Sequence, residues 1–284
     1  MSAAPGVLYV VATPIGNLED MTPNAVRALK EVSLIAAEDT RHSSKLLRHF
    51  GIRTEMTSLH EHNESNEVAT LVELLRGGKS IALISDAGTP LISDPGYRLV
   101  RAARKAGVRV LTVPGACAVI AALSVAGLPT DRFVFEGFLP ARSAARRAAL
   151  HAVVHEPRTM IFYESAHRIV ESLADMAAEF GDERQAAVAR ELTKAFETTH
   201  TGTLADLHAR IARDTEQQLG EFVVLVHGAA PRTGEVSEAA ERTLRILLAE
   251  LPLKQAVSLA TEITGAHKNS LYRLALSWRD NSGA

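Results

Sequence analysis

The sequence predicts an α/β protein made of two consecutive α/β domains and a small C-terminal helical unit. Three observations predict this class. Short apolar segments rich in β-branched residues alternate with amphipathic segments, Gly- and Pro-containing breaks separate them, and the C-terminal segment shows helical periodicity only. The chain has 284 residues, of which 46% are hydrophobic, so it can bury one large or two medium cores. We therefore expect domains at residues 1–127, 131–228 and 237–284.

The first domain is expected to be a series of βαβ units. Its strands are predicted near 7–12, 33–36, 54–59, 80–84 and 108–112, and its helices near 23–31, 41–49, 64–76, 95–106 and 117–127. Thr22 followed by Pro23 is typical of a helix start, because threonine caps the helix and proline suits its first position. By the same rule, Asp94 is expected to cap a helix that begins at Pro95.

A break with the sequence GLPTDRF, residues 127–133, is expected to separate the first domain from the second. The second domain is predicted to have strands near 133–136, 159–163, 186–190, 195–201 and 221–227, with helices near 143–153, 166–179 and 203–213. The short spacing around residues 186–201 leaves no room for a crossover helix. We therefore expect a sheet of mixed strand direction.

A polar linker at residues 228–236 leads into the helical unit. There, LPLKQAVSLATEITG and HKNSLYRLALSW are two amphipathic segments separated by Gly265-Ala266, a pattern that resembles a helix-turn-helix. Its basic residues are Lys254, Lys268, Arg273 and Arg279. Contact with nucleic acid and packing against the body or a second subunit both remain open at this point.

The bulk properties exclude several classes of protein. The formal net charge of −2 gives no general attraction to nucleic acid, so an RNA partner would have to be held by local patches. A single cysteine, Cys117, cannot form an internal disulfide. No stretch of 18 apolar residues and no secretion signal is visible, so we expect a cytoplasmic protein without membrane contact. His60 and His62 flank Glu61 as a metal site or a base would require, but a solvated loop is the simpler interpretation, and no metal is expected.

Two Ser-Asp-x-Gly turns, Ser85–Gly88 and Ser93–Gly96, follow the apolar strand near 80–84, and the loop VPGACA follows the next strand. Each can be an ordinary turn, but together they indicate a ligand site at the carboxyl edge of a sheet. Carboxylates at Asp86 and Asp94 suit an amine, a sulfonium or hydroxyl groups better than a phosphate. The GxGxxG and GxxxxGK[ST] patterns are absent, which disfavours NAD, FAD and P-loop nucleotides. Cys117 is either a nucleophile at a helix start or a small residue against which a ligand lies.

Two charged clusters follow strands of the two domains. The segment AAEDTRHSS places Glu38, Asp39, Arg41 and His42 at the ligand edge, where they offer a base and an anion-binding fork, although Asp39 or Thr40 can instead cap the next helix. The segment VARELTKAFE is the corresponding cluster of the second domain. Its charged residues, which can also form a solvated ion-pair ladder, are Arg190, Glu191, Lys194 and Glu197.

Long segments of the chain resemble a known family. The segments LYVVATPIGNLEDMTPNAVRALKEVSLIAAEDTRHSSKLL, SLHEHNE, ALISDAGTPLISDPGYRLV, VPGACA, FYESAHRI, ARELTKAFE and GEFVVLV are together similar to the ribosomal RNA small-subunit methyltransferase I family of the tetrapyrrole methylase-like superfamily. The resemblance implies two α/β domains of the tetrapyrrole methylase type with the cofactor S-adenosylmethionine in the cleft between them, commonly as a homodimer. It also implies 2′-O-methylation of a cytidine ribose in the decoding region of 16S ribosomal RNA, within the small ribosomal subunit.

The resemblance and the residue patterns described above together suggest roles for individual residues. The cofactor-contacting positions are expected to be Pro14, Asp86, Ala87, Gly88, Thr89, Ala116, Cys117 and Tyr163. The catalytic positions are expected to be Glu38, Asp39 and Arg41. The substrate-binding positions are expected to be His60, His62, Arg190, Glu191, Lys194, Lys268 and Arg273.

Some points stay open. The loop VPGACA departs from the Pro-Gly-Pro-Ser-Ala of many relatives, so a serine hydroxyl contact is in doubt. Glu38, Asp39, His60, His62 and a bound water all qualify as the base that deprotonates the ribose hydroxyl. A methylase of small tetrapyrrole-like molecules and a non-catalytic RNA-binding assembly factor are the alternative functions.

Overall fold

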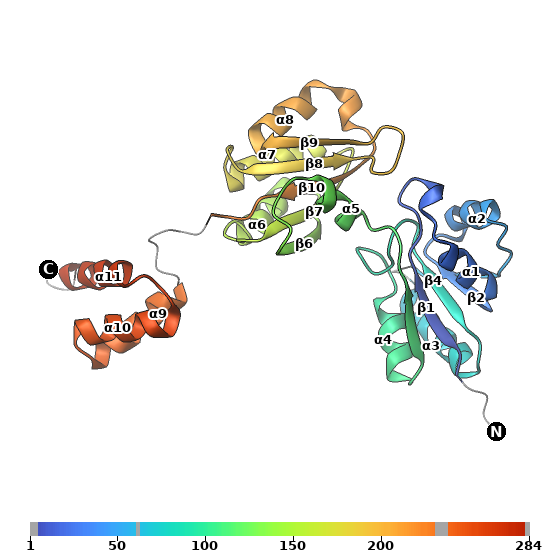
Figure 1. Cartoon of the computed structure of the whole chain (residues 1–284), viewed down its shortest axis with the longest axis horizontal. Helices are drawn as coiled ribbons and strands as arrows, with labels where there is room; N and C mark the ends of the chain where they lie inside the picture. The colour runs from blue at the N-terminus through green and yellow to red at the C-terminus, as the bar shows by residue number, and fades with distance from the viewer. Residues whose placement is uncertain (1–4, 61–62, 231–237, 282–284) are drawn as a thin grey trace. The chain divides into compact units, whose positions relative to one another are not determined.

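A computed structural model describes residues 5–60, 63–230 and 238–281 of the chain. The chain forms two compact units, Met1–Ala229 and Ala230–Ala284. The first unit contains two five-stranded sheets, and the second is helical (Figure 1).

The first sheet is parallel throughout and has the strand order β3-β2-β4-β1-β5. Its strands are β1 (Val7–Val11), β2 (Leu34–Ala37), β3 (Met56–Ser58), β4 (Ile81–Ile84) and β5 (Arg109–Val113). The crossovers are α1 (Pro23–Glu31), α2 (Thr40–His49), α3 (Glu64–Arg76) and α4 (Tyr97–Lys105). The predicted βαβ series is thus confirmed.

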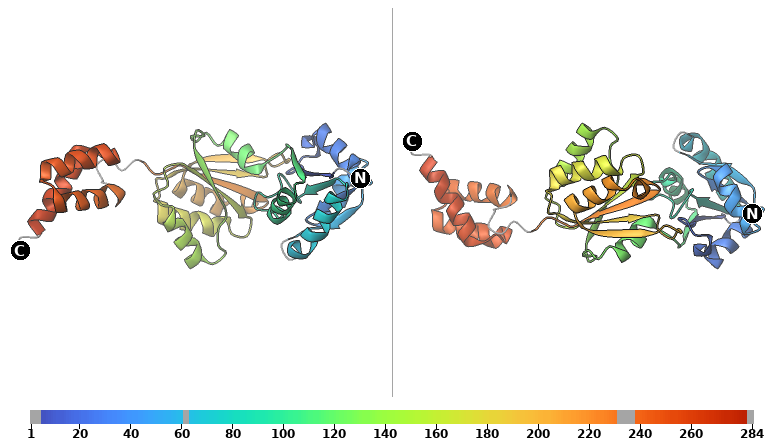
Figure 2. Two further views of the ribbon diagram at one scale, coloured as in Figure 1. Left: turned by 90° about the horizontal axis from the view of Figure 1, so that it is seen from below. Right: turned by 90° about the horizontal axis from the view of Figure 1, so that it is seen from above.

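The helices cover both faces of this sheet (Figures 1 and 2). On one face, Leu29 of α1 and Leu47 of α2 pack into one core cluster. On the other face, Leu75 of α3 and Leu99 of α4 pack into another. With both faces covered, every residue of the central strand β4 is buried, as its continuous apolar sequence requires.

The predicted start of α1 is confirmed, whereas the predicted start of α4 is wrong. The side chain of Thr22 accepts a hydrogen bond of 3.1 Å from the backbone N–H of Ala25. Helix α4 begins at Tyr97 rather than Pro95, and Gly96 precedes it with φ of 122°. Three positive-φ residues before the helix, Leu91, Ser93 and Gly96, carry the chain through an extra bend, so the Asp94 side chain does not reach the helix terminus.

The second sheet is mixed, as predicted, and has the order β6-β7-β10-β8-β9. Only β6 and β7 pair in parallel; the other pairs are antiparallel. Its strands are β6 (Phe133–Phe138), β7 (Thr159–Ser165), β8 (Gln185–Arg190), β9 (Thr198–Thr203) and β10 (Glu221–Val226). Its helices are α6 (Ser143–Ala152), α7 (Ile169–Phe180) and α8 (Leu204–Arg213).

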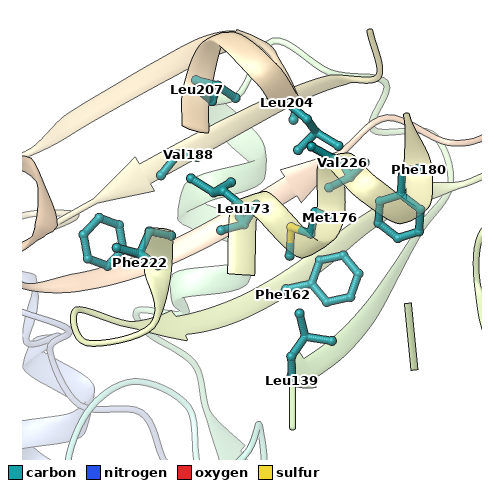
Figure 3. Close-up of a cluster of buried hydrophobic side chains, with 14 of the residues drawn as sticks. Leu139, Phe162, Leu173, Met176, Phe180, Val188, Leu204, Leu207, Phe222 and Val226 are labelled. Carbon is teal, nitrogen blue, oxygen red and sulfur yellow. The ribbon is translucent and has the colours of Figure 1, made fainter. Parts of the chain in front are cut away.

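Different helices cover the two faces of the second sheet. Helices α6 to α8 cover one face, where Phe162, Leu173 and Met176 lie in the largest buried cluster (Figure 3). The other face is covered by α5 (Ala118–Val125), which follows the last strand of the first sheet. Val119 and Leu123 of this helix pack in one cluster with residues of β7, β8 and β10. The helix that ends the first βαβ series therefore belongs to the core of the second sheet.

The second unit consists of α9 (Glu238–Glu250), α10 (Leu253–Thr264) and α11 (Lys268–Asn281) around its own core, which includes Leu244, Val257 and Leu271. Gly265 ends α10 in the left-handed conformation, with φ of 70°. Residues 231–236 of the predicted linker lie outside the described residues. None of the helices in the described part of the chain is long and apolar enough to cross a bilayer.

Arg190, at the end of β8, ties two loops together. Its buried guanidinium donates hydrogen bonds to the carbonyl oxygens of Leu219 at 2.6 Å, Glu216 at 2.8 Å and Phe196 at 3.4 Å. The loop Glu191–Glu197, here called the β8–β9 loop, is thereby held against the segment before β10. A charged donor with three backbone acceptors has a structural role in this position.

Arg190→Met is expected to lower the free energy of unfolding by about 2–4 kcal/mol, because the hydrogen bonds from a buried guanidinium to three loop carbonyl oxygens are lost. Urea denaturation followed by circular dichroism measures the change. The matched control is Arg213→Met, which alters an exposed arginine of α8 and should stay within about 0.5 kcal/mol of the unmodified protein. Equal stabilities of the two variants would contradict the structural role.

Candidate cofactor-binding and active site

A cavity of about 390 Å³ lies between the two sheets of the first unit. The first sheet contributes residues that follow β1, β2 and β4, together with the start of α5. The second sheet contributes residues of β6, β7 and β10 and of the β8–β9 loop. The volume suits a ligand of cofactor size.

The loops on the first sheet's side are joined by hydrogen bonds. Thr13 and Gly88 exchange two backbone bonds, of 2.8 and 3.1 Å, so the segments after β1 and β4 are paired. The Thr89 hydroxyl donates to the carbonyl oxygen of Ala116 at 2.9 Å and thereby joins the β4 loop to the loop after β5. Gly88 has a φ of 77°, which glycine adopts without strain.

Five carboxylates line this cavity, and three of them, Glu38, Asp86 and Asp94, lie on the side of the first sheet. The backbone N–H of Asp86 donates to Glu38 Oε2 at 3.3 Å, and the backbone N–H of Asp39 donates to Asp86 Oδ1 at 3.1 Å. Burial raises the pKa of Asp94 to about 6, with a smaller contribution from the negative charges of Glu38 and Asp86 and an opposing hydrogen bond with Ser85. The arrangement favours a ligand that brings positive charge or hydroxyl donors.

The opposite wall, on the second sheet, carries aromatic and apolar side chains beside the carboxylates Glu164 and Glu221. Tyr163 of β7 meets Phe135 and Phe138 of β6 edge to face, with ring centroids 4.8 and 5.4 Å apart. Phe138 remains 55% exposed, and Leu192 and Val223 also line the wall. Burial raises the pKa of the Tyr163 phenol, so it stays a neutral hydrogen-bonding group at physiological pH. Flat apolar groups can pack here.

Most of the predicted cofactor positions meet at this cavity. Its lining includes Asp86, Ala87, Gly88, Thr89, Cys117 and Tyr163. Ala116 contributes its carbonyl oxygen to Thr89, and Cys117 precedes α5 without a capping bond from its side chain. Pro14 lines a second cavity of about 320 Å³, which shares Ile15, Asp86, Ala87 and Glu221 with the first.

Of the three predicted catalytic residues, the structure brings only Glu38 to the first cavity. Asp39 caps α2 by accepting hydrogen bonds from the N–H groups of Arg41 at 2.8 Å and His42 at 3.4 Å, so the capping alternative is confirmed. The Asp39 carboxylate also pairs with the exposed Arg41 guanidinium at 3.2 Å, and this bond lowers the pKa of Asp39. Neither residue lines either cavity.

The predicted substrate residues are dispersed. Lys194 lines the second cavity, and its Nζ pairs with Glu191 at 2.8 Å and Glu221 at 2.9 Å, as in the ion-pair alternative. Arg190 binds loop carbonyls, and half-buried His60 lines neither cavity. Lys268 and Arg273 are exposed on α11 of the second unit, and His62 lies outside the described residues.

Sequence reasoning missed the apolar half of the site. The missed lining residues are Ile15, Ile92, Phe138, Leu192, Phe222 and Val223. Each stands at or near a strand end, but apolar residues there resemble ordinary core residues and carry no chemical signal. Within the described part of the chain, no group of three or more His, Cys, Asp or Glu side chains is gathered as a metal ion requires.

Asp94→Asn should change stability in a pH-dependent way. With a folded-state pKa of about 6 against 3.8 when unfolded, the native protein holds the proton between these values, so this carboxyl makes stability fall as pH rises from about 4 to about 6. The variant should be more stable than the unmodified protein by about 1 kcal/mol at pH 8, after allowance for solvent screening, and nearly equal at pH 4. Urea unfolding at the two pH values measures this.

Asp131→Asn, at an exposed carboxyl, is the control for loss of one negative charge. If the stability difference caused by Asp94→Asn is the same at pH 4 and pH 8, the proposed burial of the charged Asp94 is wrong.

Comparisons with known proteins place this chain in a family. A family model described as Tetrapyrrole (Corrin/Porphyrin) Methylases matches residues 7–208, and one described as the RsmI C-terminal HTH domain matches residues 234–279. Among solved structures, the methyltransferase CobJ covers 82% of this chain and 98% of its own, with a TM-score of 0.58 and 22% identity. Uroporphyrin-III-C-methyltransferase from Thermus thermophilus covers 78% and 94%, with a TM-score of 0.55 and 21% identity. These likenesses confirm the predicted fold class.

Curated relatives match the whole length. The ribosomal RNA small subunit methyltransferase I of Pseudomonas aeruginosa is 60% identical over 279 residues, which cover 98% of this chain and 99% of that protein. The protein of the same name from Escherichia coli O157:H7 is 54% identical over 95% of each chain. The chain therefore belongs to the tetrapyrrole methylase family and, within it, to the ribosomal RNA small subunit methyltransferase I family.

Proposed function

We propose that this protein transfers a methyl group from S-adenosylmethionine to the ribose 2′-hydroxyl of a cytidine in the decoding region of 16S ribosomal RNA, within the small ribosomal subunit. The observation that carries the proposal is the cavity between the two sheets, which is lined by carboxylates and by aromatic groups. Relatives that match the chain over nearly its whole length are named ribosomal RNA small subunit methyltransferase I. Work on ribosomal RNA implies a cytoplasmic protein, and the family resemblance implies a homodimer.

The cavity residues fit S-adenosylmethionine. When bound, this cofactor supplies a methyl group on a positively charged sulfur. Asp86 and Asp94 would complement positive charge and hydroxyl groups, and Phe138 would pack against a flat apolar ring. Cys117, a small residue at the start of α5, leaves room for the ligand to lie against the backbone. Pro14 and Ala116 would contribute indirectly, by fixing the backbone of the loops after β1 and β5 beside the cofactor.

Glu38 is proposed as the group that receives the proton of the ribose hydroxyl. It is the only one of the predicted acid–base residues Glu38, Asp39 and His60 to line the first cavity, and the Asp86 N–H orients its carboxylate. Asp39 is engaged with the terminus of α2 and with Arg41, so its proposed role is to position this end of the helix. Alignment of acceptor and donor would provide most of the rate enhancement, with proton removal contributing on the order of 10²–10⁴-fold.

The three proposed domains divide this work. Residues 1–127 and 131–228 would hold the cofactor and the target ribose, whereas residues 237–284 would dock the substrate through Lys268 and Arg273. A small tetrapyrrole-like substrate is not favoured, because it would give the helix-turn-helix domain no function, and the charged cavity disfavours a non-catalytic assembly factor.

Purified protein incubated with small ribosomal subunits and S-adenosylmethionine labelled in the methyl group should place label on a ribose, because the acceptor is a 2′-oxygen. A 2′-O-methylated nucleotide resists alkaline cleavage, since its 2′-oxygen can no longer attack the neighbouring phosphate. Alkaline hydrolysis followed by nucleotide analysis identifies the position.

Glu38→Gln should lower kcat by at least about 100-fold with little change in cofactor affinity measured by calorimetry.

Label on a base, with the backbone still cleaved by alkali at that site, would overturn the 2′-O assignment. Calorimetric binding of NAD, without binding of S-adenosylmethionine, would overturn the cofactor assignment.

A chain that ends at Pro231 should keep its cofactor affinity within about twofold and show at least a tenfold higher KM for small subunits. The reason is that the second unit has its own core and none of its described residues lines either cavity described above. Lys268→Glu combined with Arg273→Glu should act in the same direction, and more weakly at high salt if the two residues contact phosphates. Loss of cofactor binding or of folding on truncation would instead assign the helices to the structural core.

A further inference from the structure

Helix α2 is strongly basic in a chain whose net charge is −2. Within its ten residues it carries five basic side chains and no acidic one: Arg41, His42, Lys45, Arg48 and His49. All five are exposed, whereas Ser43 and Leu47 face the sheet. Positions 41, 45 and 48 follow the helical repeat, so their cations form one stripe on the solvent side.

The stripe is largely uncompensated. Among the residues that the structure describes, Lys45 and Arg48 take part in no ion pair. Arg41 pairs only with Asp39, and its side chain is 91% exposed, so this pair screens little of the charge. A surface of this kind attracts polyanions at short range although the whole chain does not.

The second cavity connects this stripe with the proposed active site. His42, Lys45 and Leu46 of α2 line it together with Lys194 of the β8–β9 loop. It shares Ile15, Asp86, Ala87 and Glu221 with the cofactor cavity, so the two cavities adjoin.

The groups that line the second cavity complement the parts of a nucleotide. Carboxylates of Asp86 and Glu221 stand at the end shared with the first cavity, where ribose hydroxyls can donate to them. Pro14, Leu18 and Leu46 give an apolar surface for a base, and Leu18 is 40% exposed. The Lys45 ammonium stands where a backbone phosphate of that nucleotide can bind.

We propose that the second cavity holds the target nucleotide, and that the basic stripe Arg41, Lys45 and Arg48 binds backbone phosphates of the RNA strand beside it. The proposal rests on the proposed function and adds to it the path by which the RNA reaches Glu38. It assigns Lys45 to the phosphate nearest the reacting ribose and Arg48 to the phosphate further along the strand.

Helix α4 offers a matched control. It is similarly basic, with exposed Arg98, Arg101, Arg104 and Lys105 and no acidic residue, but it packs on the opposite face of the same sheet (Figure 1). No residue of α4 lines either cavity. A non-specific electrostatic effect would act through both helices equally, whereas the proposed path involves α2 alone.

The test compares Lys45→Gln/Arg48→Gln with Arg101→Gln/Lys105→Gln in the full-length protein, since each pair removes two positive charges. Binding of a fluorescent single-stranded oligoribonucleotide and KM for small subunits are measured between about 50 and 200 mM salt. The α2 pair should lower the affinity for the oligoribonucleotide about tenfold and raise KM for small subunits about tenfold. It should also reduce the slope of log affinity against log salt by about 1.4. The α4 pair should change both less than twofold, and calorimetric cofactor affinity should be unchanged in each.

Equal losses in the two pairs, or an unchanged salt slope in the α2 pair, would overturn the proposed path. If the unmodified protein binds the oligoribonucleotide through α2 but transfers no methyl group to small subunits, the proposed function fails while the binding surface stands.

Discussion

The packing of α5 against the second sheet is the constraint on which the site depends. Only four residues separate the end of β5 from the start of the helix, so the first sheet's edge cannot move far from the surface on which α5 is buried. Val119, Ala122 and Leu123 are each less than 10% exposed in that contact. Burying a valine or leucine side chain contributes about 1.5–3 kcal/mol, which is enough to hold the two sheets as one body. The cavity proposed for the cofactor lies between the two sheets, beside the start of α5.

A second contact closes the same region from the other side. The backbone N–H of Asn17 donates to the Thr193 hydroxyl at 3.2 Å, which joins the loop after β1 to the β8–β9 loop. Gly16 allows this approach, because a Cβ at that position would overlap Cγ of Lys194. Arg190 holds the base of the β8–β9 loop through three carbonyl groups. The cavity is therefore bounded by loops that are themselves anchored.

Much of the fold could be predicted from the sequence, because apolar alternation, helix caps and turn glycines are local signals. The packing of α5 against the second sheet could not be predicted, because an apolar helix sequence indicates that the helix is buried but not which surface covers it. That the loops after β4 and β5 line one cavity could be expected from their turn sequences. Which of Glu38 and Asp39 enters the cavity was not, because the choice depends on a helix terminus that binds Asp39 and a neighbouring loop that orients Glu38. Likewise, Arg190 and Glu191 are adjacent in sequence but serve different contacts.

The hydrogen bonds between the loops after β2 and β4 have a further consequence. Asp86 Oδ1 accepts a hydrogen bond from the backbone N–H of Asp39, and the backbone N–H of Asp86 donates to Glu38. Asp86 therefore orients the carboxylate proposed to receive the ribose proton, and it also lines the cavity proposed for the methyl donor. Substitutions at 38 and 86 should therefore be non-additive. A change at either position would disturb the orientation of the proposed base and the lining of the proposed cofactor cavity together.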